Sequence, residues 1–155
     1  MDAMSILKHA RDAGVPKGIR TKFYRVDTSV ARYNSIAVVS FHGKMPDGSK
    51  GKDHGRYIAA QTVYWMTYID ALAVVMDFRD LHYRWGDSVI GAFQSINERF
   101  RDDWEDLGMA LPIKLLSSEK SSGLQSFGAD PSIFCTDMDE AIRACSRDVE
   151  IWMKG

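Results

Sequence analysis

The sequence Ala73-Val74-Val75-Met76-Asp77-Phe78 is the clearest indication of fold class in the chain. The run is almost unbroken in apolar residues and lies between two longer segments with helical periodicity. Such a run is typical of a central strand that helices cover on both faces. The sequence therefore predicts an α/β domain built around this strand.

Segments on either side of this run alternate between strand and helix patterns. Helices are predicted at 56–72, 86–107 and 136–155, and further strands at 21–26, 35–41, 111–116 and 132–135. The alternation predicts right-handed crossovers and a partly parallel sheet, with the first two strands paired as a hairpin. We expect residues 1–155 to form a single α/β domain with a mixed sheet of about five strands flanked by helices.

Two segments fall outside that alternation. Residues 1–14 predict a short amphipathic helical extension with Met4, Ile6 and Leu7 on its apolar side. Residues 43–55, GKMPDGSKGKDHG, predict a long basic loop, because Pro46-Asp47-Gly48 is a turn signal and further glycines follow it. Long loops in compact domains are often functional, so this one is a candidate contact region.

Composition favours a soluble globular protein. The chain has 155 residues, of which 45% are hydrophobic and 26% charged. No stretch approaches the ~20 apolar residues of a membrane helix, and the N-terminus lacks the apolar region of a secretory signal. Cys135 and Cys145 form no CxxC motif, and we expect two reduced thiols. These features predict a cytoplasmic protein without membrane contact.

Charge is distributed unevenly along the chain. Residues 1–56 contain 11 Lys or Arg and 5 Asp or Glu, whereas residues 57–155 contain 9 and 16. The asymmetry indicates either two solvated faces or a bipolar surface that steers a charged partner. Nucleic acid is not the expected partner, because the basic residues are scattered rather than gathered into a dense patch with exposed aromatics.

The sequence contains no recognisable catalytic or metal-binding motif. Histidines at positions 9, 42, 54 and 82 lack metal-ligand spacing, and the glycines of 43–55 match neither dinucleotide nor P-loop patterns. Asp77, Asp80 and Asp87 gather near the end of the central strand, where they indicate either a divalent-cation site or caps for turns and helices. We expect no enzyme activity, no cofactor and no metal, unless His42, His54 or these aspartates converge in a pocket.

The order of elements resembles the STAS domain, the fold of anti-sigma-factor antagonists, over about residues 21–145. The residues on which this resemblance rests are the central strand running into Arg79-Asp80-Leu81-His82-Tyr83, the long helix after it, Pro112–Leu116, Gly123–Gly128, Ile133-Phe134 and Asp139–Ile142. The resemblance implies a STAS-like sheet and a regulatory role through protein partners.

The family's phosphorylated hydroxyl follows the central strand in a D-S-[ST]-G type motif, at a helix N-terminus. Here the corresponding stretch is Arg84-Trp85-Gly86-Asp87-Ser88-Val89. An ungapped match puts Gly86, which has no hydroxyl, at the phosphoacceptor position. Ser88 substitutes for it only if the turn is two residues longer, so the departure puts a phosphorylation switch in doubt.

The stretch Leu81-x-Tyr83-x-Trp85-Gly86-Asp87 also resembles one in small bacterial immunity proteins, which bind and block a cognate toxin. Our first hypothesis is therefore a non-catalytic bacterial immunity protein whose acidic patch suits a basic toxin. A STAS-type partner-switching protein is the alternative.

Trp85 and Arg84 are of residue types common at binding hot spots, although a Trp folded back over the helix is the competing interpretation. The predicted partner-binding residues are Arg84, Trp85, Asp87, Ser88, Asp102, Asp103, Asp106, Lys50, Lys52 and His54.

Overall fold

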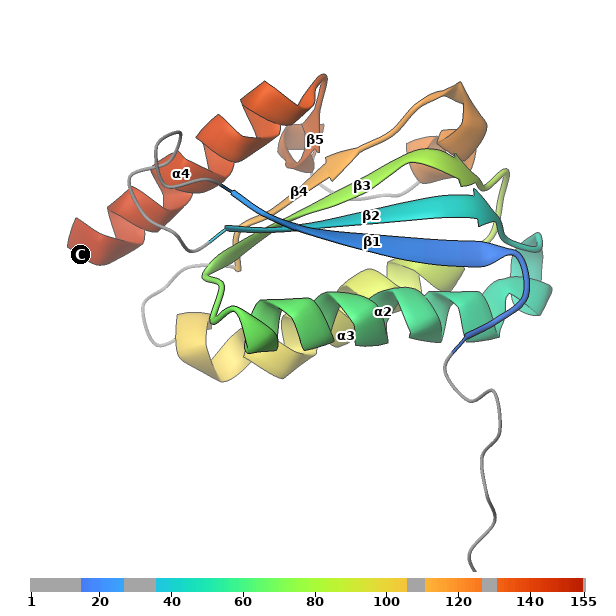
Figure 1. Cartoon of the computed structure of the whole chain (residues 1–155), viewed down its shortest axis with the longest axis horizontal. Coiled ribbons are helices and arrows are strands. Elements are labelled where there is room, and N and C mark those ends of the chain that lie inside the picture. The colour runs from blue at the N-terminus through green and yellow to red at the C-terminus, as the bar shows by residue number, and fades with distance from the viewer. Residues whose placement is uncertain (1–14, 27–35, 106–110, 127–130, 155) are drawn as a thin grey trace, which may run out of the picture.

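Five strands form one mixed sheet in which the spatial order of the strands follows their order in the chain (Figure 1). In this computed structural model, residues 15–26, 36–105, 111–126 and 131–154 are described. The strands are β1 (Ile19–Arg25), β2 (Ile36–Lys44), β3 (Ala73–His82), β4 (Ile113–Leu116) and β5 (Phe134–Cys135). β1 is antiparallel to β2, and each later pair of neighbours is parallel.

β3 is the central strand because its first six side chains are buried on both faces. Val74, Met76 and Phe78 point into the larger core, and Ala73 and Val75 into the smaller one on the opposite face. The predicted central strand is confirmed, and it continues past Phe78 to His82.

Helices cover the two faces unequally (Figure 1). α2 (Lys52–Tyr68) and α3 (Ser88–Glu105) lie side by side on one face, and α4 (Met138–Lys154) crosses the other. The buried residues of the helices recur at helical spacing, as the sequence predicted. They include Tyr57, Ile58 and Met66 in α2, Val89, Ala92 and Ile96 in α3, and Ala141, Cys145 and Val149 in α4.

The start of α4 follows from local chemistry. The Asp137 carboxylate accepts a hydrogen bond from the Glu140 N–H at 2.8 Å, and the Glu140 carboxylate accepts one from the Thr136 N–H at 2.9 Å. The first of these bonds satisfies an amide that the first helical turn leaves without a carbonyl partner. Asp137 is therefore the residue that caps the helix.

The predicted loop at 43–55 is wrong over most of its length. β2 continues to Lys44, a 3-10 helix spans Gly48–Gly51, and α2 begins at Lys52. His54 and Gly55, expected in the loop, are buried in the first turn of α2. The predicted extension at 1–14 lies outside the described residues.

The predicted α/β domain with a mixed sheet of about five strands flanked by helices is confirmed. Short 3-10 helices at Glu119–Ser126 and Pro131–Ile133 connect β4 to β5. Across the described ranges, no helix combines the length and the apolar character that a membrane crossing requires.

Candidate functional site

The segment between β3 and α3 packs against the 3-10 helix Gly48–Gly51. The Gly48 N–H donates to the Trp85 carbonyl at 3.1 Å, and the Ser88 hydroxyl donates to the Gly48 carbonyl at 3.3 Å. Arg84 forms an ion pair with Asp47, which precedes the 3-10 helix. Three consecutive contacts therefore tie residues 84–88 to a segment forty positions earlier in the sequence.

Two glycines make this close approach possible. Gly48 has φ +61°, and a Cβ at this position would lie 2.8 Å from the six-membered ring of Trp85. Gly86 has φ +125°, and a Cβ there would lie 2.9 Å from the Gly48 nitrogen. Both backbones use the left-handed region that side chains disfavour. The Trp85 ring therefore rests on Gly48, while 58% of its surface stays exposed.

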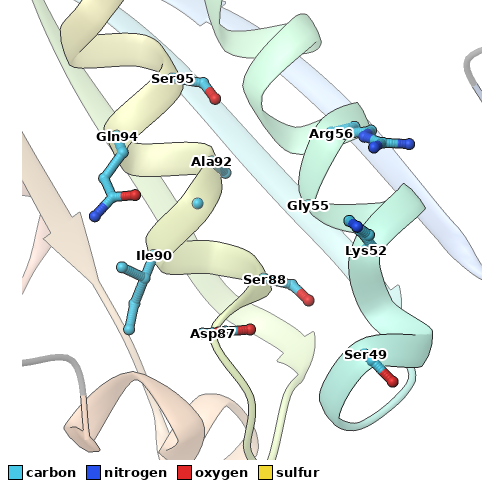
Figure 2. Close-up of a pocket in the computed structure, with 11 residues that line it drawn as sticks. Ser49, Lys52, Gly55, Arg56, Asp87, Ser88, Ile90, Ala92, Gln94 and Ser95 are labelled. Atoms are coloured by element: carbon cyan, nitrogen blue, oxygen red, sulfur yellow. The ribbon is translucent and has the colours of Figure 1, made fainter.

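An open pocket of about 550 Å³ lies between the first turns of α2 and α3 (Figure 2). Lys52 and Arg56 line it from α2, and Asp87 and Ser88 line it from the start of α3. A Cβ at Gly55 would meet the Ser88 carbonyl oxygen at 2.5 Å, so this glycine lets the two helices approach. The remaining lining residues are Ser49, Ile90, Gly91, Ala92, Gln94 and Ser95.

The electrostatics of this pocket are mixed. Ser88 is the first residue of α3, and the Asp87 carbonyl accepts the Gly91 N–H at 2.9 Å, as the first bond of the helix. The N-terminus of a helix carries partial positive charge, to which Lys52 adds a full charge. Arg56 is partly neutralised by Asp53 at 3.6 Å, and the exposed Asp87 carboxylate opposes the cations.

Tyr83 anchors the segment between β3 and α3 from the interior of the protein. Its hydroxyl donates to the Gly86 carbonyl, and its ring is buried. Burial raises the pKa of the Tyr83 hydroxyl above its ordinary value. The ring also lies 2.8 Å from where a Cβ of Gly123 would be. No local pattern predicted Tyr83 as an anchor, because its neighbour Gly123 lies forty residues further along the chain.

Of the ten predicted partner-binding residues, six lie in this region: Arg84, Trp85, Asp87, Ser88, Lys50 and Lys52. His54 does not join them on the surface. It is buried, and its Nε2 is 2.9 Å from the Lys17 carbonyl. Asp102 and Asp103 lie near the far end of α3, and Asp106 is outside the described residues. Fifteen positions separate Asp87 from Asp102, about 22 Å along a helix.

A second polar cluster lies on the face of the sheet that α4 covers, and it consists of Ser40, His42, Asp77, Arg79 and Asp80. These residues line a pocket of about 540 Å³, together with Met138, Asp139 and Ile142 at the start of α4. The Ser40 Oγ lies 2.8 Å from the Nε2 of His42, and the His42 Nδ1 lies 3.6 Å from an Asp80 oxygen. Asp77 and Arg79 form a two-pronged ion pair beside them, with both N–O distances at 2.9 Å.

Two hydrogen bonds between the Asp77 and Arg79 side chains hold this ion pair together. The hydrogen bond with the Asp77 carboxylate raises the pKa of the Arg79 guanidinium. The three aspartates that the sequence grouped together are therefore divided, because Asp77 and Asp80 line this pocket and Asp87 lines the other. Within the described residues, no group of three or more His, Cys, Asp or Glu is placed to hold a metal ion.

The alignment of Ser40, His42 and Asp80 has the residue types of a nucleophilic triad. Acyl transfer also needs amide donors for the oxyanion, whereas Ser40 lies inside a strand paired on both sides. Only 5% of the Ser40 surface is exposed. We therefore interpret the group as a hydrogen-bonded polar cluster of the sheet.

Both cysteines are free thiols. Cys145 is fully buried on the apolar side of α4, and burial raises its pKa to about 12. Cys135 ends β5 and is partly buried, and burial raises its pKa too. A thiol with a raised pKa forms little of the reactive thiolate, so neither environment is that of an activated nucleophile.

No family model and no curated protein matches the sequence. Among solved structures, the chain is similar to an anti-sigma factor antagonist from Mycobacterium paratuberculosis, at 16% sequence identity and a TM-score of 0.46. The match covers 81% of this chain and 94% of that chain.

Proposed function

We propose that this chain is a non-catalytic protein-binding module of the STAS regulatory type. A protein partner docks over Trp85, and the Ser88 hydroxyl is the group that regulates docking. The observation that carries the proposal is a mostly exposed tryptophan, held rigidly on Gly48, three residues before a serine that opens a helix.

Trp85 has the properties of an interface anchor. Its ring is supported from one side by the 3-10 helix and open to solvent on the other. A large side chain that is already ordered loses little conformational entropy when a partner covers it. Arg84, Lys50 and Lys52 are exposed nearby and supply the polar rim that such anchors usually have.

Ser88 is suited to a charge switch. A phosphoryl group on its oxygen would lie at the positive end of α3, in the pocket that Lys52 also lines. It would also replace the hydrogen bond from Ser88 to Gly48 and so loosen the support of Trp85. Ser88 is the first residue of α3, so its hydroxyl lies at the N-terminus of that helix.

Toxin neutralisation was our first hypothesis from the sequence, and it takes second place here. Its charge argument needed an acidic patch joining Asp87 to Asp102 and its neighbours. Asp87 instead lies among the cations Lys52 and Arg56, at the opposite end of α3. The toxin-neutralisation hypothesis therefore rests only on the resemblance of residues 81–87 to immunity proteins.

The test is a pull-down with the tagged full-length chain from its source cell, followed by mass spectrometry. We expect a regulatory protein or kinase near one to one, lost with Trp85→Ala and kept with Ile151→Ala. Ile151 is a matched control because it is 61% exposed and lies on α4. Recovery of a secreted toxin domain would contradict the regulatory proposal and restore the immunity hypothesis.

The role of Ser88 needs a separate comparison. Ser88→Asp and Ser88→Asn differ by one charge and have nearly the same shape. If Ser88 is the switch, the Asp variant alone changes recovery of the partner. Equal recovery with both variants would remove the switch and leave the docking surface in place.

A further inference from the structure

Four aromatic rings form a cluster of stacked and tilted pairs where β1 meets the C-terminal half of α2. Phe23 lies 5.1 Å from Trp65 and 5.6 Å from Tyr64, measured between ring centroids. Tyr68 lies 5.7 Å from Trp65 and 6.0 Å from Tyr64. The Trp65 Nε1 donates to the Tyr24 carbonyl at 2.9 Å, which ties the helix to the strand.

Much of this aromatic cluster is open to solvent. Tyr64 is 53% exposed and Tyr68 is 70% exposed. Single exposed apolar residues are ordinary on protein surfaces, whereas a contiguous group marks a binding surface. The rings hold one another in place, so a partner would meet a preformed platform.

The cluster borders the edge of the sheet. In the part of the chain that the structure describes, β1 has β2 as a neighbour on one side and no strand on the other (Figure 1). An open edge offers backbone groups to an added strand, which is a common way to bind extended segments.

The charge around this edge is strongly basic. β1 itself contains Arg20, Lys22 and Arg25 and no acid. The surface is therefore complementary to negative charge.

We propose that the open edge of β1 and the aromatic cluster bind an extended acidic segment of another protein. The segment adds a strand beside β1, its apolar side chains cover Phe23, Tyr64 and Tyr68, and its carboxylates meet Arg20, Lys22 and Arg25. This surface is independent of the one around Trp85. Lys52 and Tyr68 lie at opposite ends of α2, sixteen positions or about 24 Å apart.

Two other occupants fit the observations less well. A second copy paired edge to edge would bring the three cations of one β1 against those of the other. A nucleic acid needs phosphate-binding cations among the aromatics, yet α2 has no charged residue between Tyr57 and Tyr68. An apolar centre with a charged border is instead the anatomy of a protein interface.

The test is a selection of random linear peptides displayed on phage against the immobilised full-length chain. Enriched peptides are then synthesised and their affinities measured by fluorescence anisotropy. We expect acidic peptides with alternating apolar residues. Tyr68→Ala should weaken their binding about tenfold or more, as loss of an interface anchor does. Lys22→Glu should also weaken it, whereas Ile151→Ala and Trp85→Ala should not. Peptide binding should slow amide hydrogen exchange in β1.

Three results would overturn the proposal. The first is enrichment of peptides with no acidic bias, or no enrichment at all. The second is tight binding of a single-stranded oligonucleotide that Tyr68→Ala abolishes, which would make the surface a nucleic-acid site. The third is a dimer in sedimentation that Tyr68→Ala converts to a monomer, which would make the occupant a second copy.

Discussion

Gly48 and Trp85 are in direct contact through both backbone and side chain. The Gly48 N–H donates to the Trp85 carbonyl at 3.1 Å, and the indole ring fills the space where a Cβ of residue 48 would lie. The proposed docking surface therefore depends on the absence of a side chain at position 48.

Substitution of Gly48 by alanine should displace the Trp85 ring. The new Cβ would lie 2.8 Å from ring atoms, at a backbone φ of +61°. We expect a loss of about 1 to 2 kcal/mol in unfolding free energy, the cost of a left-handed conformation for a residue with a Cβ. A change in Trp85 fluorescence, identified by its absence in Trp85→Phe, would accompany it.

Gly91 supplies the matched control for this substitution. It lies inside α3, and a Cβ there meets nothing within 4 Å. Gly91→Ala should raise the unfolding free energy by about 0.5 to 1 kcal/mol, because alanine loses less entropy in a helix than glycine. If Gly48→Ala behaved like Gly91→Ala in urea unfolding, the described contact with Trp85 would be wrong.

The capping group of α4 gives a prediction about acid stability. Hydrogen bonds from Thr136 lower the pKa of the Glu140 carboxyl. Because the folded pKa is depressed, the stabilisation is present above the ordinary glutamate pKa of about 4.3 and is lost as pH falls through the lower, folded value. Wild-type protein should exceed Glu140→Gln in thermal stability at neutral pH, and the two should converge in acid.

Asp137 should contribute more than Glu140 to the same helix start. Its carboxylate caps the Glu140 N–H directly, and Asp137→Ala should lower the unfolding free energy by about 1 kcal/mol. Asp137→Asn retains an acceptor oxygen and should recover most of that loss. Equal destabilisation by both substitutions would mean that the carboxylate charge, not the hydrogen bond, stabilises the helix.

Cys145 predicts a loss of stability in alkali. Its pKa is raised from 9.0 to about 12 by burial, so the unfolded chain ionises first. The stabilisation is therefore complete below pH 9.0 and declines as the pH rises towards 12. Urea unfolding across this range should show a steeper decline in wild type than in Cys145→Ala, where the raised pKa values of Cys135 and Tyr83 still contribute. Aromatic disulfide reagents should modify Cys145 only after unfolding.

Ser40 should not react with a fluorophosphonate probe. The prediction follows from its burial inside a strand that is paired on both sides. Mass spectrometry of the treated protein, with a serine hydrolase as positive control, checks this. Labelling of Ser40 that His42→Ala abolishes would show that the polar cluster is an active site.

Patterns short enough to lie within one element predicted the fold well. The apolar run at Ala73–Phe78 and the stripes of α3 and α4 fix which residues are buried, and these depend on neighbours within a few positions. The cap at Asp137 was also predictable, because capping is a local interaction.

Contacts between distant segments were not predictable in the same way. Residues 52–55 have the composition of a loop, yet they form the first turn of α2, where Gly55 admits the backbone of Ser88. His54 was expected at the surface and is buried against Lys17. The cluster of Ser40, His42 and Asp80 depends on the register of two parallel strands and an irregularity between them, which no local pattern encodes.

The order of strands in the sheet has a consequence for how the chain assembles. Each strand pairs with the one before it in the chain, so a ribosome releases every new strand next to an edge that already exists. The hairpin of β1 and β2 can form first, because its contacts are the most local, and β3 can then add to β2 once the crossover α2 has emerged. α4, which covers Ile36, Val38 and Val75, is synthesised after all five strands. A nascent chain therefore exposes one apolar face of its sheet until α4 emerges, and this is the interval in which a chaperone would be needed most.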